Sequence, residues 1–322
     1  MKPIYWIILL LFMLSAWIVW EWPTQEPVLV MCDVGQGDSM LITQGFSQLV
    51  VDTGNEPDKI LRCLSQHLPF WDRQLEMVVL THPEIDHMGA FAEIMKAYAV
   101  KNLLVSPVGN DTLEFKNIYQ TISKSSIKII TAHQAQVMQL GVARLSVLWP
   151  LPQVDSIWQK NYTYEYQNIS SVVDDQKTLL DAENPNESSV VLGIDLKGVH
   201  LLLTGDISAE VELALVDQGL IEDIDILKVA HHGSKTSSQD LFLDTAKPEL
   251  ALISAGRRNR YGHPHSVVIF RLTERNIPYK RTDVEGSIQI MLAGDRMLVE
   301  KYSILPDWLS FSLDLIGPLY NK

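Results

Sequence analysis

Residues 80–89 constrain what this chain can fold into more than any other stretch. Apolar residues 77–79 are typical of a strand that enters it, and residues 90–98 have the pattern of a helix that leaves it. Between them lie two imidazoles and two carboxylates: His82, Glu84, Asp86 and His87. Such donors suit zinc, manganese or iron. A polar loop that only caps a helix rarely gathers four of them in six residues, so we predict a metal site where a strand meets a helix.

The composition fits a globular domain and argues against one class of function. Of the 322 residues 47% are apolar, which is enough for a sizeable core. The net charge of −13 argues against a protein that coats nucleic acid without regard to sequence. The two cysteines, Cys32 and Cys63, give neither a disulfide framework nor a CxxC metal motif, so we expect two buried thiols.

Residues 1–22 predict a membrane anchor. Residues 4–20 form an uninterrupted run of 17 uncharged residues, near the lower limit of about 17–25 for spanning a bilayer. Three tryptophans near its far end suit the membrane interface. A cleavable signal peptide is the alternative, although the run lacks a small-x-small cleavage site. Flanking charges place the N-terminus in the cytoplasm, so we expect a single-pass protein of the cell membrane whose body faces the periplasm or the exterior.

The rest of the chain predicts one globular domain. We expect residues 23–27 to be a linker, residues 28–300 to form the domain, and residues 301–322 to be a tail that packs on the body or the membrane. Residues 153–185 are polar and long for a connection, which predicts an inserted flap or lid. Their acidic residues are typical of a solvated face.

Two loops in the first half follow strands and carry carboxylates. In residues 33–39, Gly35 and Gly37 permit positive φ and can turn backbone amides toward an anion or a metal-bound oxygen. A glycine hairpin would explain these glycines, but it would not explain the polar residues around them, which are Asp33, Gln36 and Asp38. Asp52 follows the next strand, where a carboxylate can orient a histidine ligand.

The second half repeats this plan. A hairpin of strands at 190–196 and 199–203 ends in Thr-Gly-Asp206, as an earlier strand ends in Asp52-Thr-Gly. Two such halves predict a sandwich of two sheets with helices outside. A strand at 224–229 leads to His231 and His232, which can serve a metal and a substrate, or two metals. Buried structural histidines are the alternative, although Gly-Ser-Lys-Thr-Ser-Ser would be an unusual setting for them.

A basic cluster stands out in this acidic chain. Residues 256–265 hold three arginines, a tyrosine and two histidines, and Lys235 follows the histidine pair. Arginine, lysine and the free amides at a helix start can bind phosphate. These residues predict contacts to a polyanion.

The order of these motifs resembles the metallo-β-lactamase superfamily. Asp-Thr-Gly, Thr-His-x-Glu-x-Asp-His, Thr-Gly-Asp and Lys-Val-x-His-His-Gly-Ser follow one another within residues 28–292. Asp-Val-Gly-Gln-Gly-Asp-Ser and Asn-x-Tyr-Gly-His-Pro-His narrow the resemblance to the lactamase-like domain of the ComEC family of DNA-internalisation competence proteins. The resemblance implies an αββα fold with one or two divalent ions, zinc or manganese, at one edge of the sandwich.

The resemblance also implies roles for single residues. The implied metal ligands are His82 and Glu84 for a first ion, Asp86, His87 and His231 for a second, and Asp206 as a bridge. The implied proton carriers are Asp38 and His232, beside Asp206 as a catalytic group. The implied substrate contacts are Gln36, Lys235, Arg258, Arg260, Tyr261 and His263. Glu84 stands where many members have histidine, which favours manganese over zinc at the first site.

The implied reaction is hydrolysis of a phosphodiester, most simply DNA during competence-type uptake, by a water activated by the ions. ComEC-type proteins carry a channel domain, whereas we find one candidate membrane segment, so a separate channel-forming partner is implied. One alternative is a phosphodiesterase for small molecules or lipid headgroups, such as a phosphorylcholine esterase. Another is a non-catalytic module that binds a partner or DNA. Lactam hydrolysis is less favoured, because the sequence gives no sign of a lactam pocket.

Overall fold

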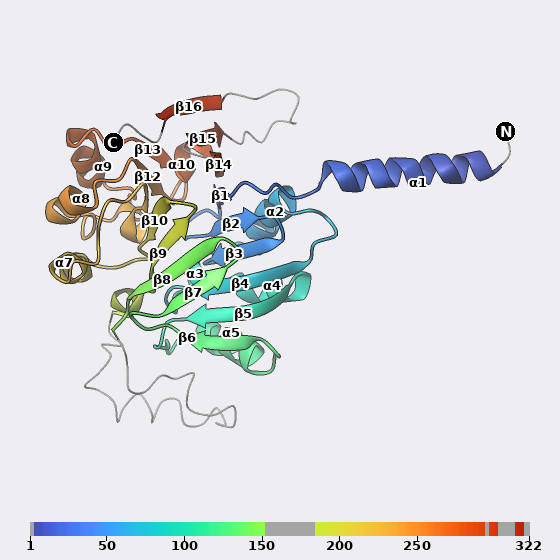
Figure 1. The fold of residues 1–322 in the computed structure, drawn as a ribbon. Coiled ribbons are helices and arrows are strands. Elements are labelled where there is room, and N and C mark those ends of the chain that lie inside the picture. The colour runs from blue at the N-terminus through green and yellow to red at the C-terminus, as the bar shows by residue number, and fades with distance from the viewer. Residues whose placement is uncertain (1–2, 152–183, 294–295, 302–312, 319–322) are drawn as a thin grey trace.

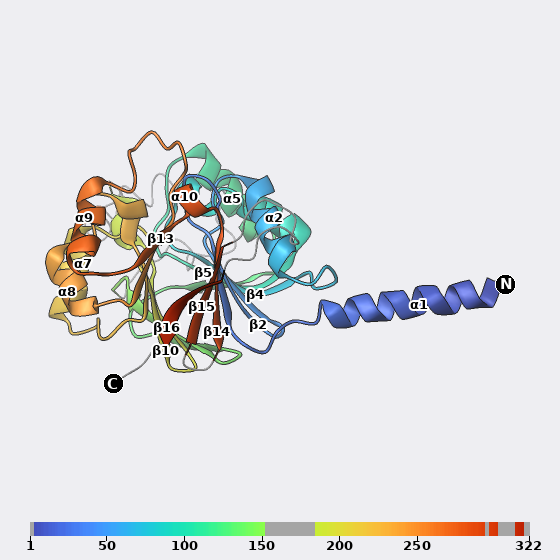
Figure 2. The same cartoon turned by 90° about the horizontal axis from the view of Figure 1, so that it is seen from above.

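Two packed β-sheets with helices on their outer faces make up the body of the protein (Figures 1 and 2). The structure is a computed structural model that describes residues 3–151, 184–293, 296–301 and 313–318. Within these ranges one sheet has nine strands, in the order β16-β15-β14-β1-β2-β3-β4-β5-β6, and the other has seven, in the order β13-β12-β11-β10-β9-β8-β7. The predicted αββα sandwich is confirmed.

The elements of the nine-stranded sheet come from both ends of the chain. Its strands are β1 (Val28–Met31), β2 (Met40–Gln44), β3 (Ser47–Val51), β4 (Gln74–Leu80), β5 (Ala99–Val105), β6 (Lys128–Thr131), β14 (Ile288–Ala293), β15 (Arg296–Lys301) and β16 (Leu313–Pro318). The helices on this side are α2 (Pro57–His67), α3 (Ile85–Met88), α4 (Phe91–Ala97) and α5 (Leu113–Ser123).

The seven-stranded sheet is built from the middle and later parts of the chain. Its strands are β7 (Val137–Leu140), β8 (Ala143–Trp149), β9 (Val191–Leu196), β10 (Val199–Leu203), β11 (Ile226–Lys228), β12 (Leu250–Ile253) and β13 (Tyr279–Arg281). The helices on this side are η2 (Pro185–Ser188), α7 (Ala209–Asp217), η3 (Ala230–Gly233), α8 (Asp240–Ala246), α9 (Ser266–Glu274) and α10 (Thr282–Glu285).

Strand β4 shows how the sequence specifies this layered core. Successive side chains of a strand point to opposite faces of a sheet. Met77 and Val79 accordingly pack in the core between the two sheets, whereas Val78 and Leu80 pack in the core beneath α2, α4 and α5. Both faces are covered, so the strand is a continuous apolar run rather than an alternating one.

The parallel strands bring chemistry-bearing loops to one edge of the sandwich. Strands β3 to β6 are parallel to one another in the first sheet, and β10 to β13 are parallel to one another in the second. The loops that follow such strands lie at their carboxyl ends, which is where open α/β sheets bind ligands. The polar motifs predicted at strand ends therefore meet in space.

The ends of the domain differ in part from the prediction. The expected boundary at residue 300 falls inside β15, and β16, which pairs with β15, lies within the expected tail. The predicted insertion at 153–185 falls almost wholly outside the described residues. Helix α1 (Pro3–Trp20) extends away from the body (Figure 1). Among the described residues, it is the helix that is long and apolar enough to cross a membrane.

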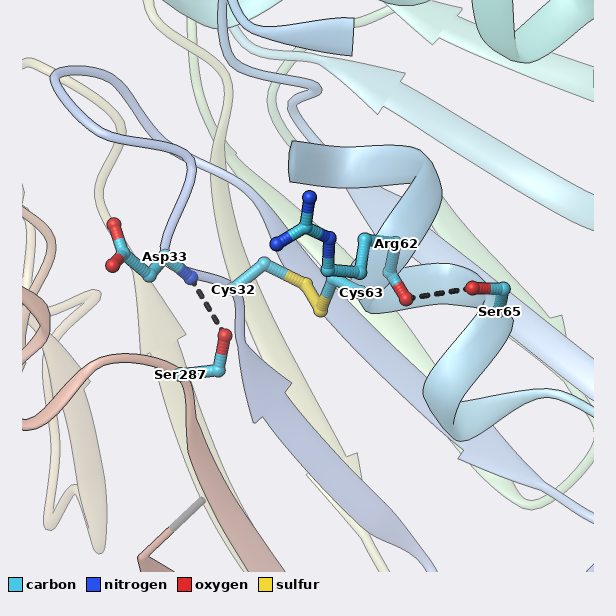
Figure 3. Close-up of a disulfide and its surroundings, with 6 residues drawn as sticks. All are labelled: Cys32, Asp33, Arg62, Cys63, Ser65 and Ser287. Carbon is cyan, nitrogen blue, oxygen red and sulfur yellow. Dashed lines mark hydrogen bonds between the residues drawn. A yellow bond between two sulfur atoms is a disulfide. The ribbon is translucent and has the colours of Figure 1, made fainter. Parts of the chain in front are cut away.

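Cys32 and Cys63 form a disulfide, so the expectation of two buried thiols was wrong (Figure 3). Their Cα atoms lie 6.0 Å apart, a usual distance for this bond. The bond links the residue after β1 to α2 and lies in the core beneath that helix. The cysteines are 31 residues apart in an ordinary-sized domain, and no spacing rule predicts such a pair.

Loss of this disulfide should lower the free energy of unfolding by about 3–4 kcal/mol, because a cross-link across 31 residues restricts the unfolded chain. Urea unfolding with and without a phosphine reductant measures the effect. The double variant Cys32→Ala/Cys63→Ala serves as control and should not respond to the reductant. An unchanged midpoint for the reduced wild-type protein would contradict the prediction.

Candidate metal centre

Loops from both sheets meet to form the candidate metal centre. His82 and His87 come from the loop and short helix after β4, Asp206 from the loop after β10, and His232 from η3 after β11. Possible ligand atoms of His82, His87 and Asp206 lie within 4.8 Å of one another. The same holds for Asp86, His87 and His232. Residues far apart in sequence therefore converge on one point.

The spacing of these atoms fits a shared cation. His87 Nε2 and His232 Nε2 each lie 3.3 Å from Asp206 Oδ2, and His232 Nε2 lies 3.4 Å from Asp86 Oδ2. Ligands placed tetrahedrally about 2.0–2.1 Å from a zinc ion are separated by about 3.3 Å. The Nε2 atoms of His82, His87 and His232 are buried and have no hydrogen-bond partner within the described residues. These donors fit one or two divalent cations.

Hydrogen bonds on the opposite ring nitrogens orient the histidines. His87 Nδ1 lies 2.8 Å from Asp52 Oδ2, and His232 Nδ1 lies 3.1 Å from the carbonyl oxygen of Ser254. The backbone amide and the hydroxyl of Thr81 both donate to Asp52, at 2.8 and 2.7 Å. Such bonds place the proton on Nδ1 and leave Nε2 as the donor to a metal. Asp52 thus lies where the sequence predicts a carboxylate that orients a ligand.

The centre is electrostatically negative without a bound cation. Burial would raise the pKa of Asp206, but His232, His87 and Lys228 hold it well below its usual range. Burial would lower the pKa of His87 and His232, yet the nearby carboxylates raise both, that of His232 to about 10. Burial beside His87 lowers the pKa of His82 to about 3, so this imidazole is neutral at physiological pH.

Lys228 is a buried cation whose role the sequence analysis missed. Its ammonium group donates to the carbonyl oxygen of Gly205 at 2.7 Å, lies 3.4 Å from Asp206 Oδ1 and forms an ion pair with Asp38. Burial would lower the pKa of Lys228, but Asp38 and Asp206 raise it. The available signal was a lysine inside the apolar run 224–229, since lysine is seldom buried unless it is paired.

The two adjacent histidines take different positions from those predicted. Both have left-handed backbones, with φ and ψ of 50° and 47° at His231 and of 54° and 20° at His232. The buried His232 joins Asp86 and His87, whereas the half-exposed His231 has its Nε2 3.9 Å from Asp206 Oδ2. The geometry therefore favours His232 over His231 as a ligand in the second group, in contrast to the assignment that the resemblance implies.

Glu84 does not join these groups as predicted. It is half-buried, it precedes α3, and it belongs to none of the clusters of close ligand atoms within the described ranges. Burial and the neighbouring Asp86 raise its pKa. His82 is instead grouped with His87 and Asp206, which differs from the implied pairing with Glu84.

A row of neighbouring rings, ending in an arginine, extends from the centre toward solvent. The ring of His263 lies 5.7 Å from that of His231, and the ring of Tyr261 stacks on His263 at 5.7 Å. The guanidinium of Arg260 lies 5.2 Å from the centre of the Tyr261 ring and donates to its hydroxyl at 3.1 Å. Three of the predicted substrate contacts are thus connected to one another and to the centre.

The other predicted substrate contacts have different surroundings. Lys235 and Arg258 are exposed, on the loops after η3 and β12 respectively. The side-chain oxygen of Gln36 accepts a hydrogen bond from the backbone amide of Gly256 at 3.3 Å, so Gln36 ties two loops together.

A cavity of about 670 Å³ opens beside Asp206 and His231. Its walls come from η2, α7 and α8 and combine apolar and polar side chains, among them Leu213, Phe242 and Gln239. The volume is in the range of small-molecule sites. A substrate group bound there would lie next to the metal ligands.

Comparison with known proteins agrees with this geometry. The family model of the metallo-beta-lactamase superfamily matches residues 32–257. The chain is 29% identical over 282 residues to ComE operon protein 3 of Bacillus subtilis, covering 80% of this chain and 32% of that protein. It is 29% identical over 272 residues to Recombination protein 2 of Haemophilus influenzae, covering 84% of this chain and 29% of that protein. The chain thus spans about a third of the length of these relatives.

A solved structure shares the fold. CmlA, a diiron β-hydroxylase from Streptomyces venezuelae, matches with a TM-score of 0.50 at 11% identity, covering 83% of this chain and 54% of that one. At this identity the likeness concerns the fold alone.

Asp52→Asn should weaken metal affinity by about 10- to 100-fold, because His87 would lose the carboxylate that fixes its tautomer and orientation. Competition with a chromogenic chelator measures the affinity. Asp217→Asn, at the exposed end of α7, is the matched control and should bind metal like the wild type. Equal affinities for the two variants would contradict the assigned role of Asp52.

Metal binding should weaken as the pH falls. Without a cation the pKa of His232 is about 10 and that of His87 is also raised, so both rings carry protons at neutral pH that a metal must displace. Affinity should therefore rise with pH until His232 titrates. Calorimetry in buffers of different ionisation heat measures the released protons. Binding without proton release at neutral pH would show that the prediction is wrong.

Proposed function

Because the chain belongs to the metallo-β-lactamase superfamily, we propose that it is a metal-dependent hydrolase that cleaves phosphodiesters, most simply DNA during competence-type uptake. The observation that carries the proposal is the convergence of three buried imidazole nitrogens without hydrogen-bond partners beside the carboxylate of Asp206. The relatives support the biological setting, since they include a competence protein, ComA of Neisseria gonorrhoeae.

The residues around the centre suit this chemistry. Divalent ions held by His82, His87, Asp206 and His232 would lower the pKa of a water and withdraw charge from the phosphoryl group. Asp206 is held as a carboxylate, since its pKa lies well below the usual range, and it faces both groups of ligands. It is therefore available at physiological pH as the bridge that the motif order implies.

The geometry changes which residues suit proton transfer. Asp38 is paired with Lys228, and although burial would raise its pKa, that ammonium and His232 lower it to about 2. It is therefore a poor base. Burial lowers the pKa of His231, and burial and its histidine neighbours lower that of His263 to about 4. Both rings are neutral at physiological pH, but the low pKa makes His263 a weak base as well, so His231, which lines the cavity, suits proton transfer better.

Basic and aromatic residues near the centre indicate which substrate it would bind. Arg258, Arg260 and Lys235 are exposed on loops next to the centre, where a polyanion would find neutralising groups. The Tyr261 ring is 55% exposed and offers a surface on which a base can stack. These features favour a nucleic acid strand as substrate.

The compartment also belongs to the proposal. Disulfides persist in oxidising compartments, so the buried Cys32–Cys63 bond supports a body that faces the periplasm or the exterior. Helix α1 would be the anchor that the sequence predicts. A separate channel-forming partner would supply what the remaining two-thirds of the longer relatives provide.

A second candidate is a phosphodiesterase for lipid headgroups. Three glutamates, Glu187, Glu210 and Glu212, line the cavity beside Asp206. Carboxylates in that position would repel phosphates and would suit a cationic headgroup such as choline. The cavity and the exposed basic residues thus favour different substrates.

His87→Asn and Asp206→Asn should each lower phosphodiesterase activity by at least about 100-fold. Loss of a metal ligand should reduce activity more than loss of a residue that only orients a ligand. The full chain in detergent with Mn²⁺ or Zn²⁺ is assayed on single-stranded DNA, bis-p-nitrophenyl phosphate and phosphocholine lipid. His200→Asn, with its exposed side chain on β10, is the matched control and should retain activity.

The same assay separates the candidates. Hydrolysis of DNA supports the leading proposal, whereas hydrolysis of the lipid alone supports the second. Activity retained by both ligand variants would refute metal-dependent hydrolysis at this centre.

A further inference from the structure

Aromatic rings gather where α1 meets the body. The ring of Trp17 stacks on that of Phe70, with centroids 4.3 Å apart. Phe70 in turn packs edge-on against Trp71 at 5.0 Å. Trp22, after α1, packs edge-on against Phe46 at 5.4 Å. The end of α1 and the residues just after it therefore contact the body through two aromatic groups, which we together call the aromatic patch: Trp17, Trp22, Phe46, Phe70 and Trp71.

The aromatic patch is open to solvent. Phe46 is 46% exposed and Phe70 is 40% exposed, Trp17 and Trp22 are exposed as well, and Trp71 is half-buried. Single exposed apolar side chains are ordinary, but adjoining ones mark a surface that binds something. Tryptophan and other aromatic rings favour the headgroup region of a bilayer. Because the patch continues directly from an apolar helix of 18 residues, its occupant is best identified as the same bilayer.

The aromatic patch and the metal centre lie at opposite ends of the nine-stranded sheet. Phe46 lies in the turn between β2 and β3, and Phe70 and Trp71 lie just before β4. The centre takes His82 from the loop after β4 and Asp38 from the loop before β2. β4 has seven residues, and at about 3.3 Å per residue it separates the two ends by roughly 20 Å. Figures 1 and 2 show α1 leaving the body at the end where β2 meets its turn.

We propose that the aromatic patch docks on the membrane interface beside α1 and holds the metal centre on the far side of the body, facing the aqueous phase. The inference rests on the proposed anchoring by α1. Its consequence concerns the substrate of the same centre. A phosphodiester in the anchoring bilayer would lie at the wrong end of the sandwich, whereas a strand in solution would have free access. Docking thus favours nucleic acid over lipid headgroups.

Depth measurements on the full chain in nanodiscs test the orientation. Both native cysteines are in the disulfide, so one introduced cysteine can carry a spin label. Phe46→Cys places the label in the aromatic patch. Val284→Cys is the matched position, because Val284 is an exposed apolar residue on α10. This helix lies between β13 and β14, at the edge of the sandwich that holds the metal centre. Collisions with oxygen report lipid, and collisions with a water-soluble nickel complex report solvent.

The label at position 46 should collide mainly with oxygen and the label at position 284 mainly with nickel. In the Phe46→Cys chain, Phe70→Ser/Trp71→Ser should raise the nickel accessibility of the label severalfold. Phe270→Ser is the matched control, since Phe270 is an exposed phenylalanine on α9, and it should leave the accessibility unchanged.

Two results would overturn the proposal, and they differ in what else they affect. Equal nickel accessibility at both positions in a nanodisc-bound chain would refute docking and leave the anchored hydrolase intact. A chain that does not copurify with nanodiscs would refute docking together with anchoring. Hydrolysis of bis-p-nitrophenyl phosphate in the same samples reports separately on the proposed activity.

Discussion

The buried charge of Asp206 governs the arrangement of the centre. A carboxylate in a protein interior is costly unless it is paired, and removing the partner of a buried ion pair typically costs about 3–5 kcal/mol. Lys228 pairs with Asp206 and Asp38, and His87 and His232 lie against the same oxygen of Asp206. One ammonium does not balance the carboxylates of this cluster. The protein thus maintains a negative site that either protons or a cation can occupy.

The architecture explains how these groups come together. Parallel strands deliver their following loops to one edge, and two sheets placed face to face double the number of loops that meet there. The loop after β1 closes the centre from a third direction. Gly37 lies against the backbone of Asp86, and a Cβ at this position would lie 2.1 Å from the Asp86 carbonyl oxygen. Its φ of 124° also suits glycine. Gly37 therefore serves close packing on the ligand-bearing helix.

Much of the fold could be predicted from the sequence, because strand ends and polar motifs are local signals. The histidines after β4 and the Thr-Gly-Asp206 ending are such signals, and the order of the motifs predicted the αββα sandwich. What failed depends on contacts between distant segments. The Cys32–Cys63 pairing needs α2 to pack beside the end of β1. His232 rather than His231 lies among the close ligand atoms. This follows from the left-handed backbones of both residues, which the amino-acid sequence does not reveal. The position of Lys228 in a largely apolar strand hints that it is buried, but its partner Asp38 is known only from the fold.

The ligand set has a mechanical consequence as well as a chemical one. His82 and His87 follow the nine-stranded sheet, whereas Asp206 and His232 follow the seven-stranded sheet. A cation held by both pairs would link the two sheets to each other. This link would lie at the edge of the sandwich that is closed by loops rather than by apolar side chains. Ligand binding at 100 times the dissociation constant adds about 2.7 kcal/mol to the folded state. At a low metal concentration the two sheets would lose this link. The protein would then become more susceptible to proteases at the same metal concentration at which the centre becomes inactive.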